Sequence, residues 1–218
     1  MLIAIDGPSG AGKGTVARAI ADTLQCRHVD TGAMYRAVAW RVLSSGLDLD
    51  DEDVVAGVAR TALLEAEQGR VVIDGHDVTS AIRTPEMDAA AARVARLPRV
   101  REALVGRQRA YAEGGDLVME GRDIGTVVLP QAQVKVYLDA SADERARRRA
   151  GDTAHAANGS DVRAVATALT TRDTSDRTRT VSPLTQASDA TYIDTTGLPI
   201  DEVVARVLAL IDAARPST

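Results

Sequence analysis

The residues best suited to chemistry lie at the start of the chain, where the segment from Gly7 to Thr15 reads GPSGAGKGT. Glycines let a backbone curl so that successive N–H groups point at phosphate oxygens, and a following helix turns its positive end to the same anion. Lys13 is long enough to reach terminal phosphates. The alternative is a glycine-rich connecting turn without a ligand. The spacing instead favours an ATP-binding loop, which consists of Gly7, Pro8, Ser9, Gly10, Ala11, Gly12, Lys13, Gly14 and Thr15.

The position after Lys13 departs from the commonest form of this loop. Serine or threonine usually follows the lysine directly, whereas here Gly14 stands before Thr15. Lys-Gly-Thr in this place is typical of small nucleotide kinases. We therefore expect Mg²⁺ to accompany ATP, with the magnesium ligands left open because Thr15 can contact phosphate instead of metal.

Other users of a phosphate loop fit the sequence less well. A GTPase switch needs an Asn-Lys-x-Asp motif to read guanine, which the sequence lacks, and Asp194-Thr195-Thr196-Gly197 is better interpreted as a strand end and turn. An ATP-driven motor would usually carry an apolar strand that ends in Asp-Glu, and we find no such pair. These absences favour a transferase.

A transferase needs an acceptor site, and arginines gather at several predicted loops. Arg36 follows the segment DTGAMY, and Arg122 and Asp123 follow a predicted strand, at the edge where α/β proteins bind ligands. A short polar run adds further charges at Arg172, Asp173, Asp176, Arg177 and Arg179. Each group alone is compatible with a solvated surface. Their joint placement after strand ends favours an anionic acceptor.

Strand patterns alternate with helix patterns along the chain. Apolar runs predict strands over 2–6, 27–30, 116–120, 134–138 and 191–194, and helical spacing predicts helices over 14–25, 33–43, 53–67, 89–112 with a break near Pro98, 142–150, 162–172 and 200–214. Two β-type runs flank Asp74-Gly75, which is a strong hairpin signal. This order predicts an α/β fold with a parallel, doubly wound sheet and a small inserted subdomain.

Composition sets the remaining bounds. The 218 residues suit one domain with a lid or insert, or at most two small domains. A 45% hydrophobic chain without Phe must fill its core mainly with aliphatic side chains. A formal net charge of −5 gives no indication of nucleic-acid binding. Cys26 is the lone cysteine, so neither a disulfide within the chain nor a cysteine zinc site is expected. Without a signal peptide or a membrane-length apolar run, we expect a cytoplasmic protein with no membrane partner.

The motifs together resemble those of the bacterial cytidylate kinases, enzymes of pyrimidine nucleotide metabolism that transfer the γ-phosphoryl group of ATP to CMP or dCMP. The similar segments are IDGPSGAGKGT, DTGAMYR, IRTPE, LPRVREAL, GRDIGTVV, VKVYLDAS and RDTSDRTRTVSPL, in this order over nearly the whole chain. The resemblance implies a P-loop kinase fold in a single domain spanning 1–218, with a core over 1–35, 100–150 and 162–218, an insert that binds the nucleoside monophosphate over about 36–99, and a lid over about 150–162.

The resemblance also implies roles for individual residues. The acceptor nucleotide would meet Thr31, Tyr35, Arg36, Arg101, Arg122, Asp123, Arg172, Asp176 and Arg179; the catalytic charges would come from Lys13, Arg36, Arg122, Arg172 and Arg179; and Arg148 and Arg149 would lie at the base of the lid. Within this set, Arg101 and Asp123 would read cytosine, and Asp176 would hold the ribose. The resemblance implies ATP, CMP and dCMP as ligands, and we expect a monomer.

Two departures from the family pattern bear on these roles. A serine that helps to read the base aligns with Ala92 in an ungapped placement, so one base contact is expected to be missing or replaced. The lid stretch GDTAHAANGSD is unusually rich in Ala and Gly. Two alternatives remain open: another nucleoside monophosphate kinase, acting on UMP or AMP, and a non-catalytic nucleotide-binding protein.

The three histidines are not expected to take part in catalysis. A phosphate acceptor is already an anion, because its second pKa is about 6, and it needs no general base. We therefore expect surface or core roles for His28, His76 and His155. Catalysis should come from positioning and charge neutralisation.

Overall fold

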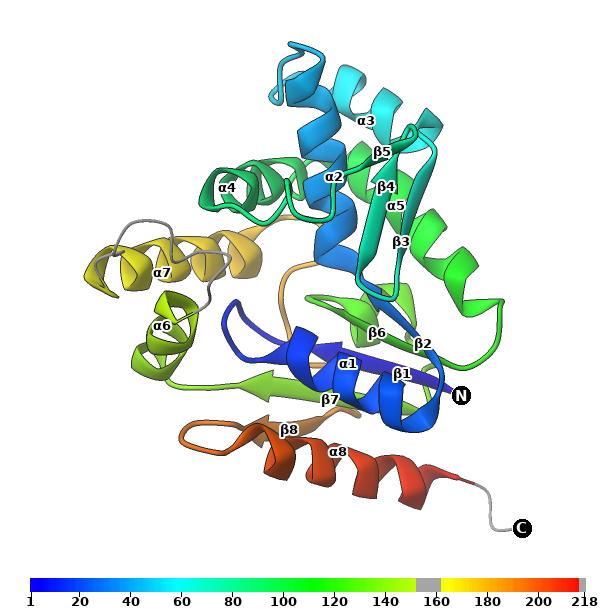
Figure 1. Ribbon diagram of the computed structural model, residues 1–218, viewed down its shortest axis with the longest axis vertical. Helices are drawn as coiled ribbons and strands as arrows, with labels where there is room; N and C mark the ends of the chain where they lie inside the picture. The colour runs from blue at the N-terminus through cyan, green and yellow to red at the C-terminus, as the bar shows by residue number, and fades with distance from the viewer. Residues whose placement is uncertain (152–161, 216–218) are drawn as a thin grey trace.

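Short apolar runs form a parallel five-stranded sheet, whose strands run across the lower half of Figure 1. The computed structural model describes residues 1–151 and 162–215. The strand order is β2-β6-β1-β7-β8, with β1 (Leu2–Asp6), β2 (Arg27–Asp30), β6 (Leu117–Gly121), β7 (Val134–Asp139) and β8 (Thr191–Asp194). The predicted parallel α/β fold is confirmed.

The central strand β1 contributes side chains to two separate hydrophobic cores, because successive side chains of a strand point to opposite faces of the sheet. Ile3 and Ile5 pack with α1 (Lys13–Leu24) and α8 (Ile200–Ala214) on one face. Ala4 faces the other core, which contains α2 (Thr31–Ser44) and α5 (Pro98–Ala112). Helices therefore cover both faces of the sheet.

A second, antiparallel sheet stands above the first, against α2 (Figure 1). It consists of β3 (Leu64–Glu67), β4 (Arg70–Ile73) and β5 (His76–Asp77), and α3 (Glu52–Thr61) and α4 (Pro85–Val94) contribute to the same core. Asp74 and Gly75 both have positive φ, 48° and 80°, which is the conformation that a two-residue hairpin turn requires. The predicted hairpin is confirmed. At its tip, the rings of His76 and Trp40 lie 5.7 Å apart.

The predicted helix over 53–67 is wrong beyond Thr61. The residues of β3 are strong helix formers, but they pair with β4 from Leu64↔Ile73 to Glu67↔Arg70. The turn between them, Gln68-Gly69, has φ values of 51° and 79°. Pairing and the burial of Ala66 outweigh local preference here.

Two helices next to the sheet complete the described part of the chain. They are α6 (Ala142–Ala150) and α7 (Val162–Thr178). Helix α7 is longer than the predicted 162–172, so the polar run that begins at Arg172 lies largely on a helix, and its assignment to a loop was wrong. After β6 the chain forms a π-helical turn, η1 (Ile124–Val128), that the sequence did not indicate.

The predicted lid over about 150–162 falls almost wholly outside the described residues, as does His155. The division into core, insert and lid therefore stays a prediction. Among the residues that the structure describes, no helix combines the length and apolar character needed to cross a membrane.

Candidate active site

A cavity of about 620 Å³ opens at the carboxyl edge of the parallel sheet. Its walls include the segments that follow the ends of β1, β2, β6 and β8, together with residues of α4, α5, α6 and α7. This is the edge at which open α/β sheets bind ligands. Of the residues predicted for the site, all except Gly7 and Pro8 line the cavity.

The phosphate loop wraps from β1 into α1 as the spacing predicts. Gly7 has a φ of 147°, and a Cβ atom there would lie 1.9 Å from the carbonyl oxygen of Leu138. Gly12 has a φ of 88° and stands at the N-cap of α1, where it supplies no side chain to cap the helix. The first N–H groups of α1 are thus available to an anion, with the positive end of the helix dipole behind them.

Lys13 lies inside the curl of this loop. Its ammonium donates a 2.8 Å hydrogen bond to the carbonyl oxygen of Pro8, and the residue is only 5% exposed. Burial, helped by the nearby positive charge of Arg122, lowers the pKa of Lys13 to about 7. A phosphate placed in the loop would reverse this effect, because an adjacent anion favours the charged ammonium.

Glu120, which sequence reasoning missed, is the acidic neighbour of the phosphate loop. It is the second-last residue of β6, the strand beside β1, and is paired with Ile5. A Cβ atom on Gly14 would lie 2.7 Å from its Oε1 atom, so glycine after Lys13 leaves room for this carboxylate. Burial, and then the nearby charge of Asp30, raise the pKa of Glu120 to about 7. Its signal in the sequence is a single acidic residue near the end of an apolar strand. The motif considered above for ATP-driven motors is an Asp-Glu pair, which does not include this case.

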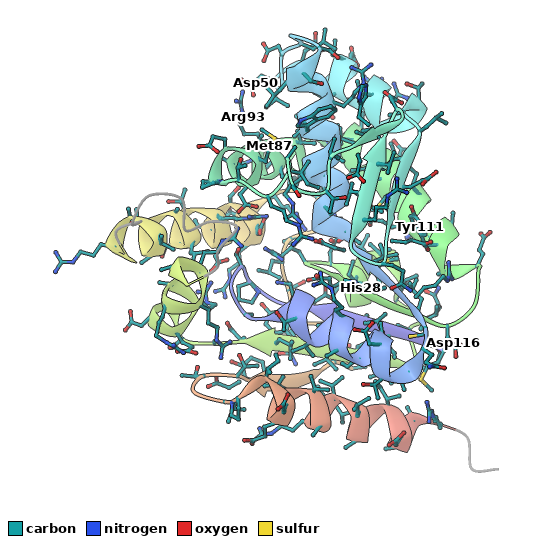
Figure 2. The ribbon with its side chains drawn as sticks, in the orientation of Figure 1. His28, Asp50, Met87, Arg93, Tyr111 and Asp116 are labelled. Atoms are coloured by element: carbon teal, nitrogen blue, oxygen red, sulfur yellow. The ribbon has the colours of Figure 1, made fainter. Side chains whose placement is uncertain are left out.

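His28 lies behind Glu120, on β2, at the centre of the molecule (Figure 2). Its Nε2 atom is 3.9 Å from Oε1 of Glu120, and burial lowers the pKa of the imidazole. A buried neutral ring behind the cavity agrees with the core role expected for His28. His76 is exposed on the second sheet.

The four arginines predicted to supply catalytic charge converge on the cavity, and each pairs with a carboxylate. Guanidinium–carboxylate distances are 2.8 Å for Arg36 with Asp30, 2.9 Å for Arg122 with Asp176, 3.1 Å for Arg172 with Asp88, and 3.6 Å for Arg179 with Asp123. These pairs fix long side chains in place before a ligand arrives. Arg177 does not join them, since it is exposed and outside the cavity lining.

The residues expected to read the base form a buried group of their own. Arg101 is 2% exposed, forms an ion pair with Asp123, and holds its guanidinium carbon 5.5 Å from the centre of the Tyr35 ring. Burial raises the pKa of Tyr35 to about 12, so the phenol is neutral. Ala92 lines the same cavity and offers a methyl group to it.

The arginines at the base of the predicted lid are anchored to the cavity wall. Arg148 donates from Nη1 and Nη2 to the hydroxyl and carbonyl oxygens of Thr195, at 2.9 and 2.6 Å, and its Nε donates to Glu144 at 2.8 Å. Arg149 forms an ion pair with Asp88. Helix α6 thereby presents both side chains to the cavity.

Arg145, also missed by sequence reasoning, connects α6 and α7 to the phosphate loop. It donates to the carbonyl oxygen of Ser9 at 3.0 Å and pairs with Asp173, which accepts from the N–H of Ser9 at 3.3 Å. A buried arginine in a basic helix gives no signal that separates it from exposed neighbours such as Arg147.

A parallel sheet whose central strand leads into a phosphate loop, beside a cavity lined with arginines, defines a P-loop kinase. Solved structures agree on the fold. A gluconokinase from Sinorhizobium meliloti superimposes with a TM-score of 0.52 at 17% identity, covering 97% of this chain and 92% of that one. An uncharacterized protein from Eubacterium ventriosum superimposes with a TM-score of 0.57 at 12% identity, over 98% and 99% of the two chains.

Sequence comparison gives the particular family. The family model described as Cytidylate kinase matches residues 3–213. Cytidylate kinases from Pelotomaculum thermopropionicum and Limosilactobacillus reuteri are 48% and 49% identical, covering 98% and 96% of this chain and 96% and 94% of their own length. The chain belongs to the cytidylate kinase family, and the resemblance noted in its motifs is confirmed.

Proposed function

We propose that this protein transfers the γ-phosphoryl group of ATP to CMP or dCMP, giving ADP and CDP or dCDP. The main observation behind the proposal is that two groups of residues suited to binding anions line the same cavity. The phosphate loop with Lys13 supports ATP binding, and Arg36, Arg122, Arg172 and Arg179 face it from the acceptor side. Membership of the cytidylate kinase family favours this acceptor over UMP or AMP.

Charge neutralisation carries the mechanism that we propose. The acceptor phosphate is a nucleophile already, because its second pKa lies near 6. Lys13 would neutralise the terminal phosphates of ATP, while the arginines would hold the acceptor phosphate in line with the group that moves. Their carboxylate partners orient the guanidinium groups without any need for a general base.

Mg²⁺ is expected to accompany ATP, and one feature of the site fits it. The Glu120 carboxylate lies against Gly14 on the cavity wall, and carboxylate oxygen is a preferred Mg²⁺ ligand, often through water. We propose Glu120 as the side chain that would hold the hydrated ion. The metal would supply additional positive charge to the β and γ oxygens.

Base selection would depend on Asp123 and Arg101. A carboxylate accepts a hydrogen bond from the exocyclic amine of cytosine, and a guanidinium donates to its ring carbonyl and nitrogen. Uracil presents a carbonyl where cytosine presents the amine, so a carboxylate disfavours it. Thr31, Tyr35 and Asp176 complete the acceptor site in this proposal, and Arg148 and Arg149 belong to the lid. On the sequence alone, we also propose that the protein is a cytoplasmic monomer.

A coupled ADP-release assay tests the proposal. The full chain is supplied with ATP, Mg²⁺ and, in separate reactions, CMP, dCMP, UMP, AMP or GMP. We expect the highest kcat/KM with CMP or dCMP. A higher value with UMP or AMP would establish the other kinase alternative, and ATP binding without transfer to any acceptor would establish the non-catalytic one.

A further inference from the structure

One carboxylate inside the cavity gathers arginines from three helices. Asp88, on α4, lies 3.1 Å from Nη1 of Arg172 on α7 and 3.6 Å from Nη1 of Arg36 on α2, and it forms an ion pair with Arg149 on α6. Its side chain is 15% exposed and lines the cavity. Asp88 was not among the residues predicted for the site.

The partners of Asp88 are the groups that the nucleotide phosphates need. Arg36 and Arg172 are assigned above to the acceptor phosphate, and Arg149 to the lid. A guanidinium group can bind a carboxylate or a phosphate in the same way, because both are compact anions that accept hydrogen bonds from its N–H groups. Burial and the neighbouring Arg122 already lower the pKa of Arg172, which reflects the crowding of positive charge here.

We propose that Asp88 is an internal substitute anion, a positioning residue that holds Arg36, Arg149 and Arg172 in the nucleotide-free enzyme and yields Arg36 and Arg172 to the incoming phosphates. This inference rests on the proposed function. Like charges that share the same partners oppose each other's binding, so the carboxylate weakens phosphate binding. It also prevents three guanidinium groups from repelling one another while the cavity is empty.

Replacing Asp88 by asparagine removes the charge and keeps the shape. For Asp88→Asn we expect the Kd of CMP, measured by calorimetry, to fall on the order of fivefold, a typical coupling between two sites. Inorganic phosphate should also raise the Tm of this variant more than that of the wild type. Asp88→Glu keeps the charge and should respond as the wild type does.

Asp50→Asn is the matched control. Asp50 pairs with Arg93 of the same helix α4 at 2.6 Å, and Figure 2 shows this pair on the outer side of the molecule, away from the sheet. Neither residue lines the cavity. Asp50→Asn should therefore leave the Kd of CMP and the response to phosphate unchanged.

The opposite results would overturn the inference. Unchanged or weaker CMP binding by Asp88→Asn, with a wild-type response to phosphate, would show that Asp88 is a fixed scaffold for the arginines. If the single variant does not fold, the charge-balanced pair Asp88→Asn with Arg149→Gln replaces it, and a larger Tm response to phosphate than the wild type is again required. The phosphate response involves no turnover, so it stays measurable even if the wild type transfers phosphate to no nucleotide.

Discussion

At the scale of single residues, the site contains buried side chains whose protonation states we expect to change when a ligand binds. Lys13 is held by the Pro8 carbonyl inside the loop, and burial lowers its pKa to about 7. Glu120, close by, has a pKa raised to about 7 by the same desolvation. In the absence of nucleotide, the pKa values of Lys13 and Glu120 therefore both lie near 7. We expect nucleotide binding to determine the protonation state of each.

Lys13→Ala should lower kcat by several orders of magnitude and leave the fold intact, because it removes the charge that we propose to face the transferring phosphoryl group. Steady-state assays with CMP, together with circular dichroism, check both parts. Lys135→Ala is the control, since Lys135 is the other lysine of the chain and pairs with Asp189 and the Pro130 carbonyl. Unchanged turnover by Lys13→Ala would contradict the assigned role.

ATP binding should be accompanied by proton uptake near pH 8. With a pKa of about 7, Lys13 is largely neutral at that pH in the free enzyme, and adjacent phosphates raise its pKa back toward the ordinary value. Calorimetric titrations in buffers of different ionisation enthalpy measure the protons bound. We expect close to one proton at pH 8 and a loss of this uptake in Lys13→Ala. Equal uptake in the variant would place the titrating group elsewhere.

Asp123→Asn should reduce the preference for CMP over UMP. The amide can donate to the uracil carbonyl, which the carboxylate cannot, so we expect the ratio of kcat/KM values to fall about tenfold, equivalent to about 1.4 kcal/mol. Parallel assays with both acceptors give the ratio. An equal loss with CMP and UMP would instead indicate that the Arg101–Asp123 pair is needed for the structure alone.

At the scale of elements, the sequence predicted the parts with strong local signals. The strands of the parallel sheet, the phosphate loop and the Asp74-Gly75 hairpin each follow from apolar runs or glycine placement. Strand β3 did not, because its residues suit a helix and only pairing with β4 makes them a strand. The site was predictable as a set of charged residues after strand ends. Glu120, Arg145 and Asp88 were not, since their importance comes from partners distant in the chain.

Two glycine substitutions separate turn geometry from helix propensity. Gly75→Ala should lower the free energy of unfolding by about 1 kcal/mol or more, because φ is 80° at this position and alanine tolerates it poorly. Gly106→Ala, in the middle of α5 with open space around it, should raise that free energy by about 0.5–1 kcal/mol. Denaturant unfolding measures both. An unchanged or raised free energy of unfolding for Gly75→Ala would contradict the turn assignment.

At the scale of the whole molecule, the proposed active site is assembled from segments spread along the chain. Thr31, Arg101, Arg122, Arg172 and Thr195 reach one cavity because parallel strands end at a common edge and the helices that follow cross back over it. No local pattern states which arginine meets which carboxylate. That pairing follows from how α2, α4, α5, α6 and α7 pack, which is why the sequence predicted the residues that line the cavity better than the contacts between them.

Hydrogen exchange should show which parts respond when the site fills. Saturation with ADP and CMP should slow amide exchange in α4, α6 and α7, because their charged side chains gain a common ligand. Strands β3, β4 and β5 contribute nothing to the cavity lining and should exchange at unchanged rates. Protection confined to this second sheet would contradict the location proposed for the nucleotides.

The contact between Trp40 and His76 gives the molecule an optical probe of its own. Trp40 is the single tryptophan of the chain, so emission excited at wavelengths too long for its four tyrosines comes from one half-buried indole on α2. Arg36 stands four residues earlier, on the same side of that helix. Acceptor binding that shifts α2 would change the indole's distance from the imidazole beside it, and CMP binding could then be followed in real time without any label.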